Sequence, residues 1–556
     1  MTPEQLSQHL VDALSTLVDE GVVRLVDGAP QQVRVERPKV REHGDYATNI
    51  AMQLAKPAGR PPREIASLVA DRLLQAPGIA AVDVAGPGFL NIRVDAAAQG
   101  VLAGEVLAAG ASYGSNDSLA GQRINVEFIS ANPTGPLHVG HTRWAALGDA
   151  LGRLLSACGA EVVRESYIND RGAQMDKFGE SLLAAAQGRS VPDDGYHGAY
   201  VIELGTRIDR EHPELRDLPA DEQLVAYREE GYRLQLAEQR QDLEDFRTHF
   251  DVWYSERTLH ADGRVKHGIE KLRQEGHVYE ADGALWMRTT DFGDDKDRVL
   301  IRSNGEHTYF ASDTAYYVDK RERGFDRCIY MLGADHHGYV RRLLAMAACA
   351  GDDPDEHIEV LIGQLVKVLR GGDELRLSKR AGTILGLREL VDITGVDALR
   401  YTLCRYPADS SMTVDVDAVT RQSSDNPVYY VQYAHARLSA ILRGAVDLGI
   451  AAGERADGYD PAVLDQPREG DLLRALAELP RVVSQAAARR EPHRVARYLE
   501  ATAATFHRFY DECRVLPMGD EEPTDVHHAR LALVAATRVV LGNGLGLLGV
   551  SAPERM

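Results

Sequence analysis

Apolar positions in the first hundred residues follow two spacings, one typical of helices and one typical of strands. The helical spacing covers residues 2–19 and 63–75, and the strand-like alternation covers 33–38 and 89–94. Thr2 precedes the first helix and has the right chemistry to cap it. These elements predict a small α+β domain over residues 1–108. The Gly/Ser/Ala-rich stretch 107–121 marks its boundary.

A strand–helix–strand pattern follows this boundary. Residues 123–130 form a short apolar run, 142–159 have helical spacing that ends at Gly159, and 161–170 look like another strand. Because the three elements fit within about fifty residues, they indicate a βαβ unit. Such a unit implies a parallel sheet, since its crossover connection is too long for a hairpin.

In the rest of the chain, the predicted secondary structure changes twice. Residues 174–260 are mostly helical, a strand-rich region begins near 283, and the chain is helical again from about 390 to its end. The strand candidates are 285–290, 298–303, 328–333 and 359–369. This order predicts an α/β domain over 116–395, with a parallel sheet interrupted by a helical insertion at about 175–282. An all-α bundle is expected over 396–556.

The chain has 556 residues, too many for one hydrophobic core, so three or more domains are expected. Its 63 basic and 84 acidic residues give a net charge of −21, which argues against non-specific nucleic-acid or membrane binding. A local basic face could still bind RNA. We see no signal-peptide pattern and no run of about 18 apolar residues, and therefore expect no membrane partner.

The five cysteines lie at positions 158, 328, 349, 404 and 513, and none forms a CxxC pair. An odd number of widely spaced cysteines in a long chain is typical of reduced thiols. We therefore expect a cytoplasmic protein.

The stretch "SANPTGPLHVGH" (130–141) combines turn-forming residues with His138 and His141. A metal site could use both imidazoles, together with "ADHHG" (334–338), and a purely structural pair is also open. Histidine metal ligands usually occur at i, i+4 or with cysteine, however, and a metal does not explain Gly140. A phosphate site explains more, because a helix beginning near Gly140 would present free backbone N–H groups to an anion.

A second loop, "RLSKRAGT" (376–383), follows the predicted strand 359–369. Ser378 and Lys379 could stabilise a pyrophosphate leaving group there. The alternative is an ordinary basic surface loop.

With these residues in view, the chain resembles a class I aminoacyl-tRNA synthetase. "HVGH" is similar to the HIGH motif of that class, and "RLSK" is similar to its KMSKS motif. Longer stretches resemble the arginyl-tRNA synthetase family: "VEFISANPTGPLHVGHTR", "TYFASDTAYYVDK", "DALRYTL", "DNPVYYVQYAHAR", "LGVSAPERM", "REHGDYATNIAMQLAK" and "GPGFLNIRV". The resemblance runs from about residue 1 to 556. It implies a Rossmann-like catalytic domain between an N-terminal additional domain and a DALR-type anticodon-binding bundle.

The resemblance also implies the chemistry. It implies ATP-dependent attachment of L-arginine to tRNA(Arg) through an arginyl-adenylate, with release of AMP and pyrophosphate. His138 and His141 would stabilise the α-phosphate, and Gly140 would lie under the adenine. Ser378 and Lys379 would contact ATP, with Lys379 on the β- and γ-phosphates. Mg²⁺ would arrive with ATP, bound through substrate phosphates rather than by a protein cage, so no structural metal is expected.

For arginine, the resemblance implies a set of polar residues around a planar cation. Asp313 and Glu256 would pair with the guanidinium, and Tyr309 would stack on it or close the pocket. Glu127 and Asn132 would hold the α-amino group and nearby polar groups, and Asp335 could bind an α-ammonium. The alternatives are structural ion pairs for Glu256 and Glu127 and a simply buried ring for Tyr309.

For tRNA, the resemblance implies that the C-terminal bundle contacts the anticodon and the N-terminal domain contacts the corner of the molecule. Helical spacing places Tyr433 and Arg437 on one face, where Tyr433 could either pack or stack on a base. Phe89 and Asn91 are the N-terminal candidates. The expected partners are tRNA(Arg), L-arginine and ATP, and we expect a monomer.

Overall fold

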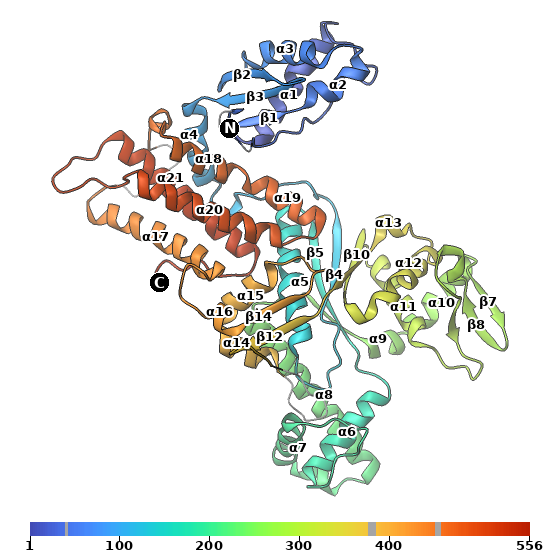
Figure 1. Cartoon of the computed structure of the whole chain (residues 1–556). Helices are drawn as coiled ribbons and strands as arrows, with labels where there is room; N and C mark the ends of the chain where they lie inside the picture. Colours follow the sequence, from blue (N-terminus) through green and yellow to red (C-terminus); the bar gives the residue numbers. More distant parts are fainter. Residues whose placement is uncertain (39, 41–42, 376–384, 451–457) are drawn as a thin grey trace.

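The computed structural model describes the whole chain except residues 39, 41–42, 376–384 and 451–457. Its N-terminal domain packs helices against one antiparallel sheet of order β1-β3-β2 (Figure 1). The elements are α1 (Pro3–Asp19), β1 (Tyr46–Thr48), α2 (Ile50–Ala58), α3 (Pro62–Leu73), β2 (Ile79–Ala85) and β3 (Phe89–Val94). Thr2 caps α1 in a capping box with Gln5, as its sequence predicts.

The expected strand at 33–38 is wrong. Only Glu36 pairs there, through two backbone hydrogen bonds with Ala47, so the segment makes a single bridge. Val33 and Val35 are buried, which produces the strand-like alternation without a ladder. Pro38 lacks the N–H that would extend the pairing.

The predicted α/β domain is built on a five-stranded parallel sheet of order β11-β10-β4-β5-β6, which confirms the predicted parallel sheet. Its strands are β4 (Arg123–Glu127), β5 (Glu161–Ile168), β6 (Val252–Ser255), β10 (Arg327–Gly333) and β11 (Ile358–Gly363). Helix α5 (Val139–Ala157) connects β4 to β5 and packs its apolar residues on the sheet. The βαβ unit predicted from the sequence is therefore present.

The helices between β5 and β6 leave this sheet and lie at the bottom of Figure 1. They are α6 (Ala173–Ala186), α7 (Ala199–Glu211) and α8 (Ala220–Asp245). The expected insertion of 175–282 needs correction at its end, because β6 lies inside that range and pairs with β5. All four residues of β6 are half-buried, so no alternation of buried and exposed positions indicates the strand.

A second excursion follows β6 and occupies the right of Figure 1. Two of the predicted strands, near 285 and 298, form a small antiparallel sheet there rather than joining the parallel one. The excursion contains α9 (Glu256–Ala261), α10 (Arg264–Gln274), β7 (Val278–Ala281), β8 (Ala284–Met287), β9 (Arg298–Ile301) and α11 (Tyr309–Glu322). The chain then returns through β10 to the 3-10 turn η5 (Ala334–Tyr339), α12 (Val340–Cys349) and α13 (Pro354–His357).

The candidate strand 359–369 is two strands. β11 ends at Gly363, and β12 (Val366–Arg370) belongs to another small sheet with β13 (Asp373–Glu374) and β14 (Met412–Asp415). Gly363 lets the end of β11 pack closely on α5, because a Cβ at this position would lie 2.4 Å from the Trp144 ring.

The C-terminal region is mostly helical, as expected, but the predicted all-α bundle over 396–556 needs correction at β14, which pairs with β12. Its helices are α14 (Leu387–Thr394), α15 (Val396–Cys404), α16 (Val416–Val419), α17 (Pro427–Asp447), α18 (Pro467–Ala477), α19 (Leu479–Arg489), α20 (His493–Glu512) and α21 (Asp525–Leu547). Helix α4 (Ala96–Ala109) packs on α18 and α21 and joins the N-terminal domain to this bundle (Figure 1).

One described helix, α21, is long and apolar enough to cross a membrane, with a mean hydropathy of 1.3. Arg530 and Arg538 interrupt its apolar positions, which is why no such run is apparent in the sequence. Because 61% of the apolar stretch is buried and α21 packs on α17 and α20, it is the core helix of the bundle.

A buried ion pair fastens the bundle to α5. Arg400 of α15 donates through Nη2 to Asp149 of α5 at 2.5 Å, and both side chains are fully buried. Arg400 also donates to the carbonyl oxygens of Phe246, Arg247 and Leu548 at 2.9–3.1 Å. One guanidinium therefore joins the sheet helix, the end of the insertion and the end of the bundle.

We predict that Arg400→Met destabilises the protein. The substitution breaks a buried ion pair, a loss that costs about 3–5 kcal/mol, and leaves Asp149 with Arg153 Nε at 2.7 Å as its remaining hydrogen-bond partner. The midpoint of chemical unfolding should fall clearly below that of the unchanged protein. Arg60→Gln, which removes an exposed pair with Glu64, is the control and should change stability by at most about 1 kcal/mol. Equal midpoints for the two variants would contradict the structural role of Arg400.

Candidate active site

The predicted site residues gather where the parallel strands end. β4 ends at Glu127, β5 just before Asn169, β6 just before Glu256, and β10 just before η5. The carboxyl edge of a parallel sheet is where such folds bind ligands. Ile129, directly after β4, has φ +53°, an unusual conformation for a β-branched residue. Its carbonyl accepts a hydrogen bond from Ser166 at 2.9 Å, which helps to hold the turn.

His138 and His141 form the N-terminus of α5. His138 is the N-cap, and its Nδ1 accepts from the backbone N–H of Gly140 at 3.1 Å. His141 Nδ1 accepts from the backbone N–H of His138 at 3.3 Å, and the ring centroids are 4.0 Å apart. Because both Nδ1 atoms accept, each neutral ring carries its proton on Nε2. The pair thus offers two imidazole N–H donors at the positive end of a helix dipole.

Gly140 has a structural requirement that the sequence does not reveal. A Cβ at this position would lie 2.8 Å from Cε1 and 2.9 Å from Nδ1 of His138. Glycine is therefore needed for His138 to fold back over the first turn of α5. The residue is also exposed, which leaves its outer face accessible to a flat ring.

The histidine loop is joined to the chain that follows the basic loop. Leu387 N donates to Leu137 O at 2.8 Å, Val139 N donates to Leu385 O at 3.3 Å, and His138 bridges to Gly386. The segment directly after residue 384 therefore lies against the histidines. Ser378 and Lys379 themselves fall outside the described residues.

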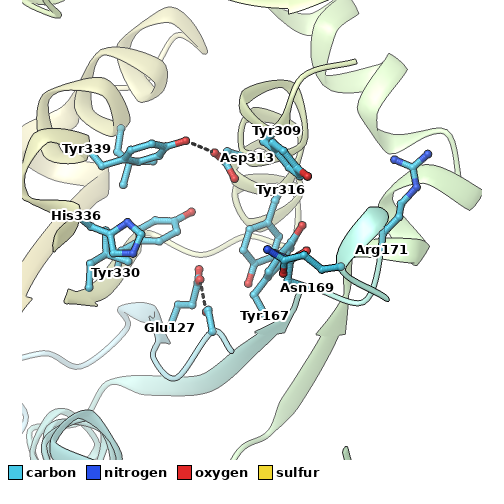
Figure 2. A pocket seen from close by; sticks show the side chains of 14 residues that line it. Glu127, Tyr167, Asn169, Arg171, Tyr309, Asp313, Tyr316, Tyr330, His336 and Tyr339 are labelled. Atoms are coloured by element: carbon cyan, nitrogen blue, oxygen red, sulfur yellow. Dashed lines mark hydrogen bonds between the residues drawn. The ribbon is translucent and has the colours of Figure 1, made fainter. Parts of the chain in front are cut away.

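Two cavities adjoin at the histidine loop. The first, which we call the histidine cavity, has a volume of about 500 Å³ and is lined by His138, His141, Asn132 and Gln239, among others. The second, the tyrosine cavity, has a volume of about 470 Å³. Its polar wall comprises Glu127, Tyr167, Tyr309, Asp313, Tyr316, Tyr330 and Tyr339 (Figure 2). Ser130 lines both cavities, so they meet at the start of the loop.

Asp313 is the half-buried acid of the tyrosine cavity. Burial raises the pKa of its carboxyl to about 6, against the opposing effect of a hydrogen bond from Tyr339. Tyr339 Oη donates to Asp313 Oδ2 at 2.8 Å, and Figure 2 shows this bond across the top of the cavity. A carboxylate with such a pKa is mostly ionised at neutral pH and would attract a cation.

Glu127 faces the same cavity from the opposite side and is buried. Its Oε2 accepts from Lys320 Nζ at 2.6 Å, and its Oε1 accepts from Ser130 Oγ at 2.7 Å. Lys320 is fully buried and lies over the rings of Tyr316 and Tyr330, 4.3 and 4.0 Å from their centroids. The structural ion pair given above as the alternative role for Glu127 is therefore formed, and it lies at the wall of the tyrosine cavity.

Sequence reasoning missed Lys320, Tyr316 and Tyr339. The first two share a signal with residues that were found. Tyr309, Asp313, Tyr316 and Lys320 recur at helical spacing, which places them on one face of α11. Tyr339 lies on a separate turn, and no local pattern points to it.

Glu256 does not line the tyrosine cavity. It is buried in a third cavity of about 230 Å³ with His260 and Arg302, and burial raises the pKa of its carboxyl to about 7. Tyr309 and Arg171 line both this cavity and the tyrosine cavity. Tyr309 is 68% exposed, so its ring is not simply buried.

Two other predicted arginine contacts lie apart from Glu127 and Asp313. Asn132 lines the histidine cavity and donates to the Gln174 side chain, which itself lines the tyrosine cavity. The Asp335 side chain is 82% exposed, beside His336 at 3.5 Å. In the described residues, no three His, Cys, Asp or Glu side chains cluster as metal ligands.

The candidate tRNA contacts lie on outer surfaces far from both cavities. Tyr433 is 37% exposed on α17, stacks parallel to Tyr429 at 6.1 Å, and accepts from Arg437 Nη2 at 2.8 Å. Phe89 is 40% exposed on β3, where Leu90 and Ile92 point into the core. Asn91 is half-buried on the same face as Phe89.

A parallel sheet that presents HVGH at its carboxyl edge, with a helical bundle behind it, defines a class I aminoacyl-tRNA synthetase. The family models for the arginyl tRNA synthetase N terminal domain, the class I (R) catalytic domain and the DALR anticodon binding domain match the chain. They cover residues 4–94, then 104–196 with 221–432, and finally 431–556.

Comparison with full-length relatives agrees with these family-model matches. The chain is 56% identical to the arginine–tRNA ligase of Kineococcus radiotolerans and 57% identical to that of Frankia alni, over all of both chains in each case. The arginyl-tRNA synthetase structure from Thermus thermophilus has the same fold, with a TM-score of 0.75 and 24% identity. The match covers 99% of this chain and all of that one. The chain belongs to the arginine–tRNA ligase family.

We predict that Gly140→Ala lowers kcat for aminoacylation about 10- to 100-fold, because the new methyl group must displace the His138 ring. Gly546→Ala is the matched control. It also adds a methyl group within a helix, but nothing lies within 4 Å of that position. The prediction would fail if both variants kept the kcat of the unchanged protein.

Proposed function

We propose that the tyrosine cavity holds arginine and the histidine cavity holds ATP, so that the two reactants meet at Ser130. The reaction is ATP-dependent attachment of L-arginine to tRNA(Arg) through an arginyl-adenylate, with AMP and pyrophosphate released. The observation that carries the assignment is the shared wall of the two cavities. Formation of an adenylate requires the carboxylate of one substrate to reach the α-phosphate of the other.

The proposal assigns the guanidinium of arginine to Asp313. A planar cation with five N–H donors needs a carboxylate of fixed orientation, and Asp313 is half-buried and held by Tyr339. Tyr309, exposed at the mouth of the cavity, would close over the bound substrate. Glu256 would act from the neighbouring cavity by adding negative charge behind Tyr309 and Arg171.

The α-ammonium of arginine is assigned to Glu127. A carboxylate offers about four acceptor sites, and Lys320 and Ser130 use two of them. Lys320 would hold the Glu127 carboxylate in place when the cavity is empty. Asn132 and Asp335 would contribute at the rim, nearer the carboxylate that reacts.

The α-phosphate of ATP is assigned to His138 and His141. Their Nε2–H groups and the N-terminus of α5 would stabilise the negative charge that develops as the carboxylate attacks. Gly140 would lie under the adenine. Lys379 would hold the β- and γ-phosphates, assisted by Ser378. Mg²⁺ would come as MgATP, bound through the phosphates.

The three regions of the chain would divide the work on tRNA. Residues 396–556 would bind the anticodon, with Tyr433 and Arg437 as an aromatic and cationic pair for a base and a phosphate. Residues 1–108 would contact the corner of tRNA through Phe89 and Asn91. Residues 116–395 would carry out the chemistry. We also propose that the protein works in the cytoplasm as a monomer.

We predict that Asp313→Ala raises the KM for arginine about 100-fold, equivalent to about 3 kcal/mol of lost binding. The KM for ATP should change far less, since Asp313 does not line the histidine cavity. Asp262→Ala, an exposed aspartate at the end of α9, is the control and should leave both constants unchanged. An unchanged KM for arginine in Asp313→Ala would remove Asp313 from the substrate site.

A further inference from the structure

We propose that Tyr339 is a positioning residue for arginine: its hydroxyl fixes the plane of the Asp313 carboxylate and keeps that carboxylate ready to receive a guanidinium. The inference rests on the role proposed above for Asp313. Tyr339 would act through Asp313, without itself bonding to the cation.

The two residues come from different walls of the tyrosine cavity. Asp313 projects from the first turns of α11, and Tyr339 ends the turn η5 after β10. Their hydrogen bond, 2.8 Å long, spans the cavity in Figure 2. The Tyr339 ring is in turn held by Arg342, whose guanidinium carbon lies 4.2 Å from the ring centroid.

Orientation matters because the terminal torsion of an aspartate is soft. A guanidinium pairs with a carboxylate through two parallel N–H···O bonds only when the two planes coincide. Tyr339 occupies one acceptor site of Oδ2, which restricts rotation of the carboxylate. Three of its roughly four acceptor sites remain for a bound cation.

Ionisation matters because only the ionised carboxylate pairs with a cation. Burial raises the pKa of Asp313, the Tyr339 hydrogen bond lowers it, nearby Glu127 raises it and Arg342 lowers it, with a result of about 6. The other titratable or charged groups that line the cavity are Tyr309, Tyr316, Tyr167, Tyr330, His336 and Arg171. Lys320 lies behind Glu127, and Glu256 lies in the neighbouring cavity. Without the Tyr339 hydroxyl, the pKa of Asp313 would rise further, toward neutral pH.

Tyr339→Phe tests this role, because it removes the hydroxyl and keeps the ring on Arg342. The KM for arginine should rise at every pH as the carboxylate loses its fixed plane. It should rise further in acid, since a protonated Asp313 cannot pair with a cation. For a shift of about one pKa unit, the ratio of variant to unchanged KM should be about threefold larger at pH about 6.5 than at pH about 8.5.

Tyr317→Phe is the matched control. Tyr317 lies on α11, the helix that carries Asp313. It donates to Asp352 at 2.7 Å but does not line the tyrosine cavity. It loses the same kind of hydrogen bond, so a general loss of stability would appear in both variants. A KM for arginine with the same pH dependence in both Tyr→Phe variants would overturn the proposal.

A cycle with Asp313→Ala separates this inference from the proposed function. If Asp313→Ala leaves the KM for arginine unchanged, the substrate assignment itself is wrong. If Asp313→Ala raises the KM and Tyr339→Phe adds nothing to it, Tyr339 acts through Asp313, as proposed. If Tyr339→Phe raises the KM equally in the presence and absence of Asp313, Tyr339 contacts the substrate independently, and the positioning role is wrong.

Discussion

The structure depends on the ion pair between Arg400 and Asp149. Removing both charges from water costs several kcal/mol each, so such a pair needs further hydrogen bonds to its remaining donors. Arg400 meets this condition through three carbonyl oxygens from two distant segments. Gly549 makes room for it, since a Cβ there would lie 2.2 Å from Nη2 of Arg400. The helix fixed by Asp149 is α5, whose N-terminus carries the histidines.

Helix α5 therefore connects the C-terminal bundle to the candidate active site. At its middle it is held by the bundle that bears Tyr433, and at its N-terminus it forms the wall of the histidine cavity. Arg143, one turn past the histidines, adds a second anchor through the carbonyls of Gln364, Ser410 and Pro407. A site that relies on positioning and electrostatics, with no protein nucleophile, needs such a rigid frame.

The features that depend only on neighbouring residues could be predicted from the sequence. The cap of α1, the βαβ unit and the HVGH turn were all found, because each is determined by neighbouring residues. β6 was not predicted, because its four half-buried residues show no periodicity. Glu127 and Asp313, which the sequence proposes as site residues, line the tyrosine cavity, but their partners Lys320 and Tyr339 were not predicted, since they lie 193 and 26 residues away. The separate cavity of Glu256 likewise follows from how α9 packs, which no motif encodes.

The central claim is that arginine and ATP occupy adjoining cavities and react at Ser130. The most direct test is a crystal structure with a non-hydrolysable arginyl-adenylate analogue. The account predicts the guanidinium on Asp313, the adenosine beside His138 and Gly140, and the phosphate substitute next to Ser130. A guanidinium bound in the cavity of Glu256 and His260, with Asp313 unoccupied, would contradict it.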